Sequence, residues 1–335
     1  MLKRFIILLC LPLILCACTK SSKEEITFSS WGSVTEVSIL NKIIAEYEKE
    51  NPDVKINFVH VPQNYFQKLH LLFAANQAPD VIFINNLYLP IYASKLEPLE
   101  NVIDTNEFDT KSIKAMSVEG HLYAVPRDIS TLVFYRNKDL VKTTPQKLEE
   151  LIPAIEGVKP YGISLEHDVY FMLPYVLTFA EDIYNPKNSA EYYKNLEGKY
   201  APTASQVGSS TLAQMFLQGK IGLYLSGRWM YPKIKENANF DWDVIPFCGT
   251  VPLDASGWAI SKSAKNKKQA EEFLKYLSSR KSIEYFNSTG LIVPARRDVK
   301  IDNLAFTKAI KQSRPIAYGK NYKKMADKLN KELFK

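Results

Sequence analysis

The chain has 335 residues, of which 46% are hydrophobic and 24% charged, and a net charge of +7 at pH 7. This length favours two domains, and the near-average composition excludes a disordered chain, a collagen and a small disulfide-packed scaffold. The basic excess is mild and its lysines and arginines are scattered, so we expect no nucleic-acid partner.

The chain begins with the pattern of a signal peptide. Lys3 and Arg4 precede an apolar run from Phe5 to Leu15, which is too short to span a bilayer comfortably. The motif Leu15-Cys16-Ala17-Cys18 resembles the lipobox of bacterial lipoproteins. An ordinary cleaved signal or a membrane anchor helix remains the alternative interpretation.

The lipobox resemblance implies a signal peptide over residues 1–17, lipidation of Cys18 and a polar tether over 18–25. We therefore expect a lipid-anchored protein outside the cytoplasm, facing the periplasm or lying at the cell surface. Cys10 and Cys16 would be removed with the signal peptide, which leaves Cys248 without a disulfide partner. We expect Cys248 to be a small buried hydrophobic residue.

After the tether, strand-like and helix-like patterns alternate over about sixty residues. Ser33 and Glu36 have the spacing of a capping box at a helix start. Apolar periodicity predicts strands over 26–30, 54–61 and 80–84, with a helix between each pair of strands. This order predicts a parallel sheet with right-handed crossovers, the core of a doubly wound domain.

The same kinds of pattern return later in the chain, less regularly. We expect strands over 220–225, 241–246 and 258–261, and helices over 146–155, 211–218, 229–236, 265–279, 303–312 and 322–334. Two α/β lobes are the simplest arrangement for a chain of this length.

Motifs for covalent chemistry are absent. The sequence contains no G-x-S-x-G, no Walker-type loop and no G-x-G-x-x-G, and its four histidines do not have H-E-x-x-H spacing. We therefore expect no enzyme, no cofactor and no metal site. Paired carboxylates of a glycosidase leave no sequence motif, so that alternative stays open.

Three of the four tryptophans lie beside glycine at predicted strand junctions, namely Trp31, Trp229 and Trp258. Ligands of open α/β sheets bind outside the carboxyl ends of the strands. A tryptophan face suits the C–H face of a sugar ring, and neighbouring polar side chains can bond its hydroxyls. The competing interpretation is that these tryptophans are core or lobe-boundary residues.

Several segments together resemble the extracellular solute-binding proteins of ABC importers, the branch with maltose- and glycerol-3-phosphate-binding proteins. The matching segments are ITFSSWG, YEKENPDVKI, QAPDVIFINN, GHLYAVPRDISTLVFYRNKDL, FLQGKIGLYLSGRW, SGWAISKSAKNKKQAEEFLKYLSS and GLIVPARRDV. The resemblance implies two α/β lobes of the periplasmic-binding-protein fold, each a mainly parallel sheet flanked by helices, with a ligand cleft between them. This chain is shorter than many relatives before Tyr200, which puts ligand contacts from 143–200 in doubt.

The resemblance also implies lobe boundaries and a ligand site. The N-terminal lobe would comprise 24–128 plus 255–300, and the C-terminal lobe 135–250 plus 301–335. The cleft-lining positions that it implies are Trp31, Glu36, Asn85, Asp128, Arg228, Trp229, Gly257, Trp258 and Arg296. The protein would be a monomer that delivers a small solute to ABC permease subunits in the membrane.

The tryptophans favour a mono- or oligosaccharide as this solute. Glycerol-3-phosphate or a related phosphodiester is the alternative, because Arg127, Arg228 and Arg296 lie near predicted junctions and arginine binds phosphate bidentately. Ferric iron on Tyr192 and Tyr193 is a third ligand, although packing is the simpler role for that pair. A surface lipoprotein glycosidase and a purely structural lipoprotein are the alternatives of another class.

Overall fold

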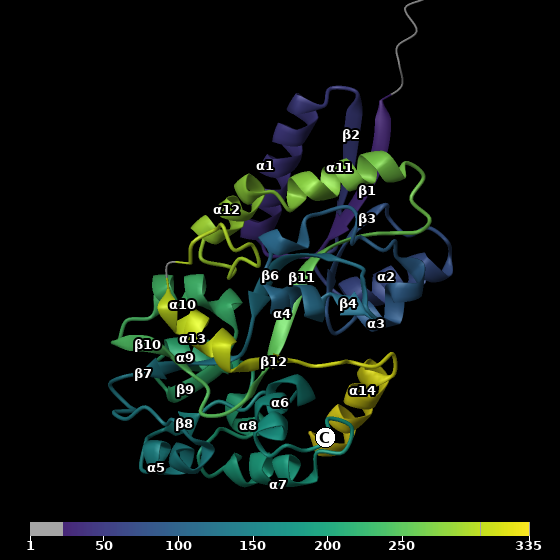
Figure 1. Ribbon diagram of the computed structural model, residues 1–335. Coiled ribbons are helices and arrows are strands. Elements are labelled where there is room, and N and C mark those ends of the chain that lie inside the picture. Colours follow the sequence, from purple (N-terminus) through teal and green to yellow (C-terminus); the bar gives the residue numbers. More distant parts are fainter. Residues whose placement is uncertain (1–22, 302, 335) are drawn as a thin grey trace, which may run out of the picture.

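The computed structural model describes residues 23–301 and 303–334, which form two α/β lobes (Figure 1). The predicted signal peptide, Cys18 and the first tether residues lie outside the described residues. In the part that is described, no helix is both long and apolar enough to cross a membrane.

The first lobe is built on a sheet with the strand order β12-β11-β3-β1-β2, in which β6 also pairs with β11. The strands are β1 (Glu24–Ser30), β2 (Val54–His60), β3 (Val81–Asn85), β6 (Val125–Ser130), β11 (Val251–Ile260) and β12 (Ser313–Pro315). β1 runs parallel to β2 and β3, which confirms the parallel sheet predicted for this segment. The apolar run of β3 is buried along its length, as expected for a central strand.

Helices cover both faces of this sheet: α1 (Val34–Glu50), α2 (Tyr65–Ala74), α3 (Leu89–Tyr92), α4 (Thr110–Ala115), α11 (Lys267–Leu277) and α12 (Arg280–Ser288). The predicted capping box at the start of α1 is confirmed. The Ser33 hydroxyl accepts from the Glu36 amide at 3.3 Å, and the Glu36 carboxylate accepts from the Ser33 amide at 2.9 Å. This reciprocal pair fixes Glu36 in the first turn of the helix, directly after β1.

The second lobe holds a sheet with the order β10-β7-β9-β8. Its strands are β7 (Val133–Asn137), β8 (Tyr161–Ile163), β9 (Ile221–Ser226) and β10 (Trp242–Pro246). β7 is antiparallel to β9 and β10, whereas β8 and β9 are parallel. This differs from the mainly parallel sheet that we expected here. β7 leaves the lobe boundary directly after β6, and β9 returns to that boundary with Ser226 opposite Val133.

The second lobe is helix-rich on its outer side. Its helices are α5 (Leu151–Ile155), α6 (Val169–Thr178), α7 (Lys187–Leu196), α8 (Ala204–Val207), α9 (Leu212–Leu217), α10 (Tyr231–Asn237), α13 (Leu304–Gln312) and α14 (Tyr322–Leu333). Helix α14 packs on α6, where Tyr322 and Ala326 are buried against Leu173. The C-terminal helix therefore lies beside the boundary between the lobes (Figure 1).

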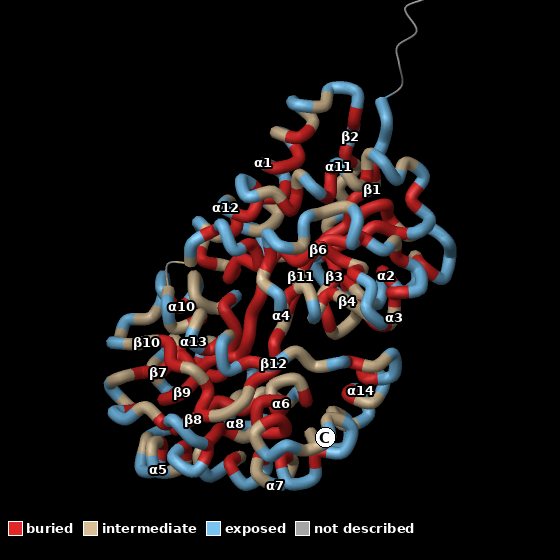
Figure 2. Tube along the Cα trace, viewed as in Figure 1, coloured by how far each residue is buried: buried red, intermediate tan, exposed pale blue. Residues whose placement is uncertain are grey.

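Each lobe has its own apolar interior, visible as buried stretches along the central strands (Figure 2). The first core takes its buried residues from 26–125 and 255–299, and the second from 132–251. A third cluster, which includes Ile129, Leu253 and Phe306, lies where the crossing strands meet α13. The lobe boundaries themselves stay a prediction.

Candidate functional site

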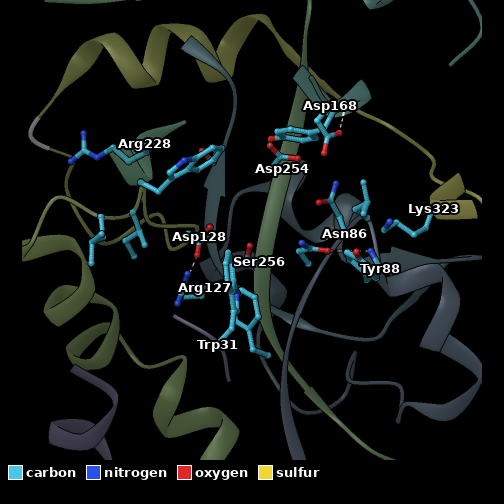
Figure 3. Close-up of a pocket in the computed structure, with 18 of the residues that line it drawn as sticks. Trp31, Asn86, Tyr88, Arg127, Asp128, Asp168, Arg228, Asp254, Ser256 and Lys323 are labelled. Atoms are coloured by element: carbon cyan, nitrogen blue, oxygen red, sulfur yellow. Dashed lines mark hydrogen bonds and ion pairs between the residues drawn. The ribbon is translucent and has the colours of Figure 1, made fainter. Parts of the chain in front are cut away.

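A cavity of about 550 Å³ lies between the lobes (Figure 3). The first lobe lines it with the residues that follow β1 and β3, with β6 and with the middle of β11. The second lobe contributes α6, the turn after β9 and α14. Small-molecule pockets measure roughly 300–1,000 Å³, so the cavity has the size and the strand-end position of a solute site.

Two tryptophans from opposite lobes face this cavity. Trp31 follows β1 in the first lobe, and Trp229 lies in the short turn after β9 in the second. Both residues are exposed, at 47% and 43% of their surface, which is unusual for tryptophan. An exposed tryptophan in a concave site marks a surface that a ligand can cover.

Gly227 makes room for the ring of Trp229. A Cβ atom at Gly227 would lie 1.9 Å from the Trp229 ring, well inside van der Waals contact. The ring therefore folds against the glycine backbone, and the missing side chain sets its orientation.

Arg127 joins two carboxylates in the lining of the cavity, and Figure 3 shows its pair with Asp128. Its Nε donates to Asp128 Oδ2 at 2.6 Å, and its Nη1 donates to Glu36 Oε1 at 3.3 Å. The guanidinium carbon lies 5.5 Å from the ring centre of Trp258 and 4.9 Å from that of Phe286. Burial raises the pKa of Asp128, and the Arg127 charge opposes that rise. Arg127 is thus held by protein groups on several sides.

Asp254 and Tyr170 form a second polar pair, at the opposite wall. The Tyr170 hydroxyl on α6 donates to Asp254 Oδ2 on β11. Burial raises the pKa of Asp254 to about 7; the Asp128 charge also raises it and the Tyr170 hydrogen bond lowers it. This carboxyl group therefore gains or loses its proton near neutral pH.

Arg228 is anchored by the segment that returns from the first lobe. Its Nε donates to the Gly290 carbonyl oxygen at 2.7 Å. The guanidinium carbon lies 4.7 Å from the ring centre of Tyr231 and 4.5 Å from that of Phe306. These contacts hold the backbone of the neighbouring Trp229 in place.

The structure brings six of the nine predicted site residues to the cavity: Trp31, Glu36, Asn85, Asp128, Arg228 and Trp229. Their roles in ligand binding stay a prediction. The other three, Gly257, Trp258 and Arg296, do not line the cavity.

Trp258 is a core residue with no accessible surface. Its ring packs edge-on against Phe28 at 5.4 Å and Phe83 at 5.7 Å. Strand alternation places it on the same side as Ser256, but the guanidinium of Arg127, which lines the cavity, lies over its ring. Trp258 supports this lining from beneath instead of touching a ligand.

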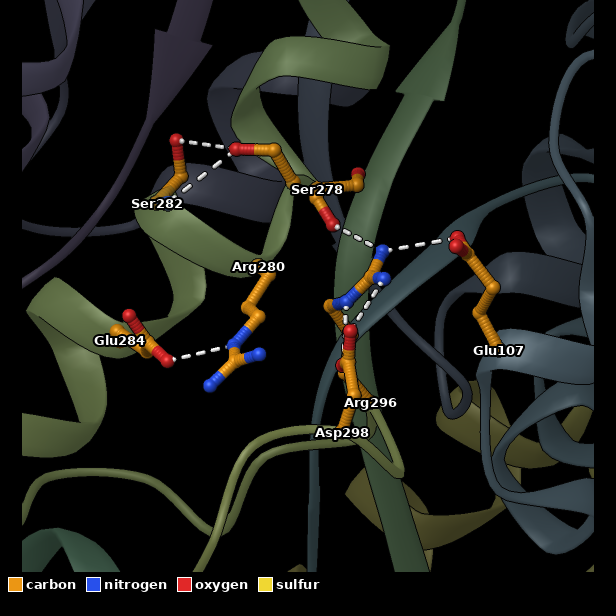
Figure 4. Close-up of polar contacts among 8 residues, drawn as sticks. Glu107, Ser278, Arg280, Ser282, Glu284, Arg296 and Asp298 are labelled. Atoms are coloured by element: carbon orange, nitrogen blue, oxygen red, sulfur yellow. Dashed lines mark hydrogen bonds and ion pairs between the residues drawn. The ribbon is translucent and has the colours of Figure 1, made fainter.

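Gly257 allows β11 and β6 to pack closely together. A Cβ atom there would lie 1.9 Å from the Val125 carbonyl oxygen, where the register of β11 against β6 shifts. Arg296 lies apart from the cavity and binds Asp298 and Glu107 at 2.9 and 3.0 Å (Figure 4). It also donates to the Ser278 carbonyl oxygen, so it ties the loop after α11 to the return segment.

Sequence reasoning missed several lining residues, among them Asn86, Tyr170 and Asp254. Asn86 binds the backbone of β11 through Leu253 and Ala255. Asp254 and Ser256 are two residues apart on β11, so their side chains share a face, and this spacing was a usable signal for Asp254. Tyr170 and the lining residues of α14 gave no signal, because periodicity shows that a helix is amphipathic and not where it packs.

The cavity is more acidic than basic. Its charged lining residues are five carboxylates and three cations: Glu36, Asp128, Asp168, Asp254, Asp327, Arg127, Arg228 and Lys323. Within residues 23–301 and 303–334, no cluster of histidine, cysteine or acidic side chains could hold a metal ion. Such a lining suits a neutral ligand with hydroxyl groups better than an anion.

The two tyrosines considered for iron have packing roles. Tyr193 is buried and donates to the Glu166 carbonyl oxygen at 2.7 Å. Tyr192 packs against Tyr175 and Phe179. Neither residue lines the cavity.

Known proteins resemble this chain over most of its length. A family model described as bacterial extracellular solute-binding protein matches residues 31–284. The maltodextrin-binding protein MdxE of Bacillus subtilis is 28% identical over 332 residues, a match that covers 84% of this chain and 77% of that protein. The galactooligosaccharide-binding protein of the same organism is 24% identical over 331 residues, covering 84% and 76%.

Among solved structures, an ABC substrate-binding protein from Listeria monocytogenes in complex with cycloalternan superimposes with a TM-score of 0.81. Its sequence identity is 21%, and the match covers 93% of this chain and 92% of that one. The similarity therefore extends over both lobes of the fold.

Proposed function

The chain belongs to the bacterial extracellular solute-binding proteins, and on this premise we propose that it captures a carbohydrate between its lobes for an ABC importer. Its relatives MdxE and the galactooligosaccharide-binding protein are named for sugars of this kind. Membership of an extracellular family places its action outside the cytoplasm.

The observation that carries the proposal is the presence of Trp31 and Trp229, from opposite lobes, on one cavity. Each ring exposes nearly half of its surface. Flat aromatic surface removes the weakly hydrated C–H face of a sugar from water, and two such rings can grip a ligand from both lobes.

Polar groups around the rings suit hydroxyl groups. Glu36, Asp128 and Asn85 bring carboxylate and amide atoms into the cavity, which can accept and donate hydrogen bonds to a sugar.

The alternative phosphate ligand needs arginines that can turn toward it. Arg127 already binds two carboxylates, and Arg228 donates to the Gly290 carbonyl oxygen. Arg296 lies outside the cavity. The geometry of the cavity therefore favours a neutral, hydroxyl-rich sugar unit over a phosphodiester.

Binding would proceed by lobe closure and would leave the ligand unchanged. A ligand that touches both lobes binds their closed arrangement more tightly, and this differential affinity shifts the equilibrium between open and closed forms. The matched family and the named relatives are binding proteins. The glycosidase alternative predicts product formation, which binding alone does not.

Membrane attachment and assembly complete the proposal. Acyl chains on Cys18 would tether a monomeric protein near permease subunits of the importer. Metabolic labelling with a radioactive fatty acid tests the anchor, since Cys18→Ser should abolish incorporation. If the Cys18→Ser protein still incorporates the label, the predicted lipidation site is wrong, and the capture proposal is unaffected.

The capture proposal is tested by thermal shift and calorimetry against mono- and oligosaccharides, glycerol-3-phosphate and ferric iron. At a hundred times Kd, a ligand stabilises the protein by about 2.7 kcal/mol. We expect Trp31→Ala and Trp229→Ala to weaken sugar binding at least about tenfold. Trp242→Phe is the control, because Trp242 lies on β10 away from the cavity.

Stabilisation by glycerol-3-phosphate or iron, with no sugar effective, would overturn the carbohydrate assignment. Chromatography of the incubated sugar separates capture from hydrolysis. Steady formation of shorter products would establish the glycosidase instead.

A further inference from the structure

A groove leads out of the cavity between α2 of the first lobe and α14 of the second, with a volume of about 1440 Å³. The cavity and the groove share the residues Trp31, Asn85, Tyr88, Lys323 and Asp327. They are therefore one continuous depression, and a ligand longer than the cavity would extend along the groove.

The groove is basic where the cavity is acidic. Its charged lining residues are five lysines and one aspartate: Lys320, Lys323, Lys324, Lys328, Lys331 and Asp327. Two of the lysines are engaged, because Lys323 binds Asp327 and Lys328 lies 3.6 Å from Glu332. The sign of the charge thus reverses from the inner to the outer part of the depression.

Three lysines are available to a ligand. Lys320, Lys324 and Lys331 are exposed, and within the described part of the chain no carboxylate forms an ion pair with them. Lys324, Lys328 and Lys331 recur at steps of four and three, which places them along one side of α14, and Lys320 lies in the turn just before this helix. An extended ligand would meet a row of ammonium groups there.

The facing wall is aromatic and carries no acid. Phe66 and Tyr88 stack with ring centres 3.7 Å apart and planes 8° apart. The ten residues of α2 include no carboxylate, so nothing on this helix neutralises the lysines opposite. The groove therefore offers a flat ring surface on one wall and positive charge on the other.

We propose that the ligand is an acidic oligosaccharide, with an uncharged unit in the cavity and carboxylate- or sulfate-bearing units along the groove. This inference rests on the proposed function and narrows its substrate class. The inner unit is gripped by the tryptophans, and the outer anionic units lie beside Lys320, Lys324 and Lys331. An acidic protein segment is the competing occupant, and the test below separates the two.

The experiment titrates the purified protein with matched trimers and tetramers that differ in acidic groups alone. The acidic member of each pair has one neutral hexose at one end and hexuronate units in the remaining positions. Its partner is the all-hexose fragment of the same linkage, and the pairs cover the galactose, glucose and mannose series. We expect the acidic member of at least one pair to bind about tenfold more tightly at low salt. This advantage should shrink between about 0.02 and 0.3 M salt, because exposed charges are screened over that range.

The triple variant Lys320→Gln, Lys324→Gln, Lys331→Gln should remove the preference, since each exposed pair contributes a few-fold to affinity. Its affinity for the neutral fragments should stay within about twofold. The control variant Lys49→Gln, Lys235→Gln, Lys268→Gln removes the same charge from exposed sites elsewhere and should retain the preference.

Each possible result supports or overturns the proposed acidic ligand. If neutral and acidic fragments bind alike, or if both triple variants behave alike, the acidic class is wrong while sugar capture stands. If polyglutamate binds through the three lysines and no acidic sugar does, the groove belongs to a protein partner. If no sugar of any kind binds, the proposed function fails and this inference fails with it.

Discussion

The Tyr170 hydroxyl donates a hydrogen bond to Asp254, and this bond joins the second lobe to the strand that crosses from it to the first. The pair lies in the wall of the cavity, where burial raises the pKa of Asp254 to about 7. The charged groups nearest this carboxyl include Asp128, which adds to the rise. The contact between the lobes therefore contains a group that titrates near neutral pH.

Asp254 should make folding stability fall as the pH rises from about 4 to about 7. Its pKa is raised in the folded protein, so the folded state keeps the proton in this window while the unfolded chain releases it. The contribution of Asp254 to the free energy of unfolding is then highest at the acid end and levels off above pH 7, a difference on the order of 4 kcal/mol. Urea unfolding across this range measures it.

The variant Asp254→Asn isolates this contribution, because its amide has nearly the same shape and does not titrate. We expect the stability of the variant, relative to the unmodified protein, to rise between pH 4 and pH 7. Asp53→Asn is the control, since Asp53 is exposed and should leave the pH profile as it was. Parallel profiles for Asp254→Asn and the unmodified protein would show that Asp254 does not titrate in this window.

Gly227→Ala should weaken ligand binding without destabilising the fold. The added methyl group would overlap the Trp229 ring, and a half-exposed ring can swing into solvent at little cost. We expect affinity to fall about as far as in Trp229→Ala, with unfolding free energy changed by less than about 1 kcal/mol. Calorimetry with the best sugar and urea unfolding provide the two readouts. Unchanged affinity would mean that the orientation of this ring does not matter.

Arg296→Met should lower stability and leave ligand affinity unchanged. The guanidinium binds Asp298 and Glu107 and lies 5.2 Å from the ring centre of Phe108. Its partners are half-exposed and regain water, so we expect a loss of about 1–2 kcal/mol. Arg280→Gln is a matched control, because its bond to Glu284 is on the surface (Figure 4).

The contact between Arg296 and Asp298 predicts a pH dependence of stability opposite in sign to that of Asp254. The hydrogen bond and charge of Arg296 lower the pKa of Asp298. This contribution is present above the ordinary aspartate pKa and is lost as the pH falls below it. Arg296→Met should therefore differ most from the unmodified protein near neutral pH and least in strong acid. A reduced sugar affinity in this variant would instead show that Arg296 contributes to ligand binding.

Local signals in the sequence predicted the first lobe well. The capping box at Ser33 and the apolar run of β3 are encoded in consecutive residues, and both appear where expected. In the second lobe, the direction of β7 depends on how the chain crosses from β6. Strand periodicity does not contain that information, so the antiparallel pairs of this sheet were not foreseen.

The sequence identified the site residues for which a position directly after a strand is enough to expose the side chain. Trp31 and Trp229 follow strands that end at the cavity, where both are partly exposed, and their part in ligand binding stays a prediction. Trp258 also lies beside a glycine, but it is within β11, and neighbouring side chains cover it. Depth beneath a surface depends on residues distant in sequence, here Arg127 and Phe286, which a local pattern cannot reveal.

The three tryptophans should therefore separate into two classes when they are replaced. Trp258→Ala removes a large ring from the core of the first lobe, which should cost about 3–5 kcal/mol. Trp31→Ala should cost less than about 1 kcal/mol in stability, because its ring is half-exposed, and should instead lower sugar affinity. Trp258→Phe keeps an aromatic ring beneath Arg127 if the alanine variant does not fold. We expect this variant to lose stability while its sugar affinity stays within about threefold. A large loss of affinity in folded Trp258→Phe, with a normal Trp31→Ala, would reverse the roles assigned to the two residues.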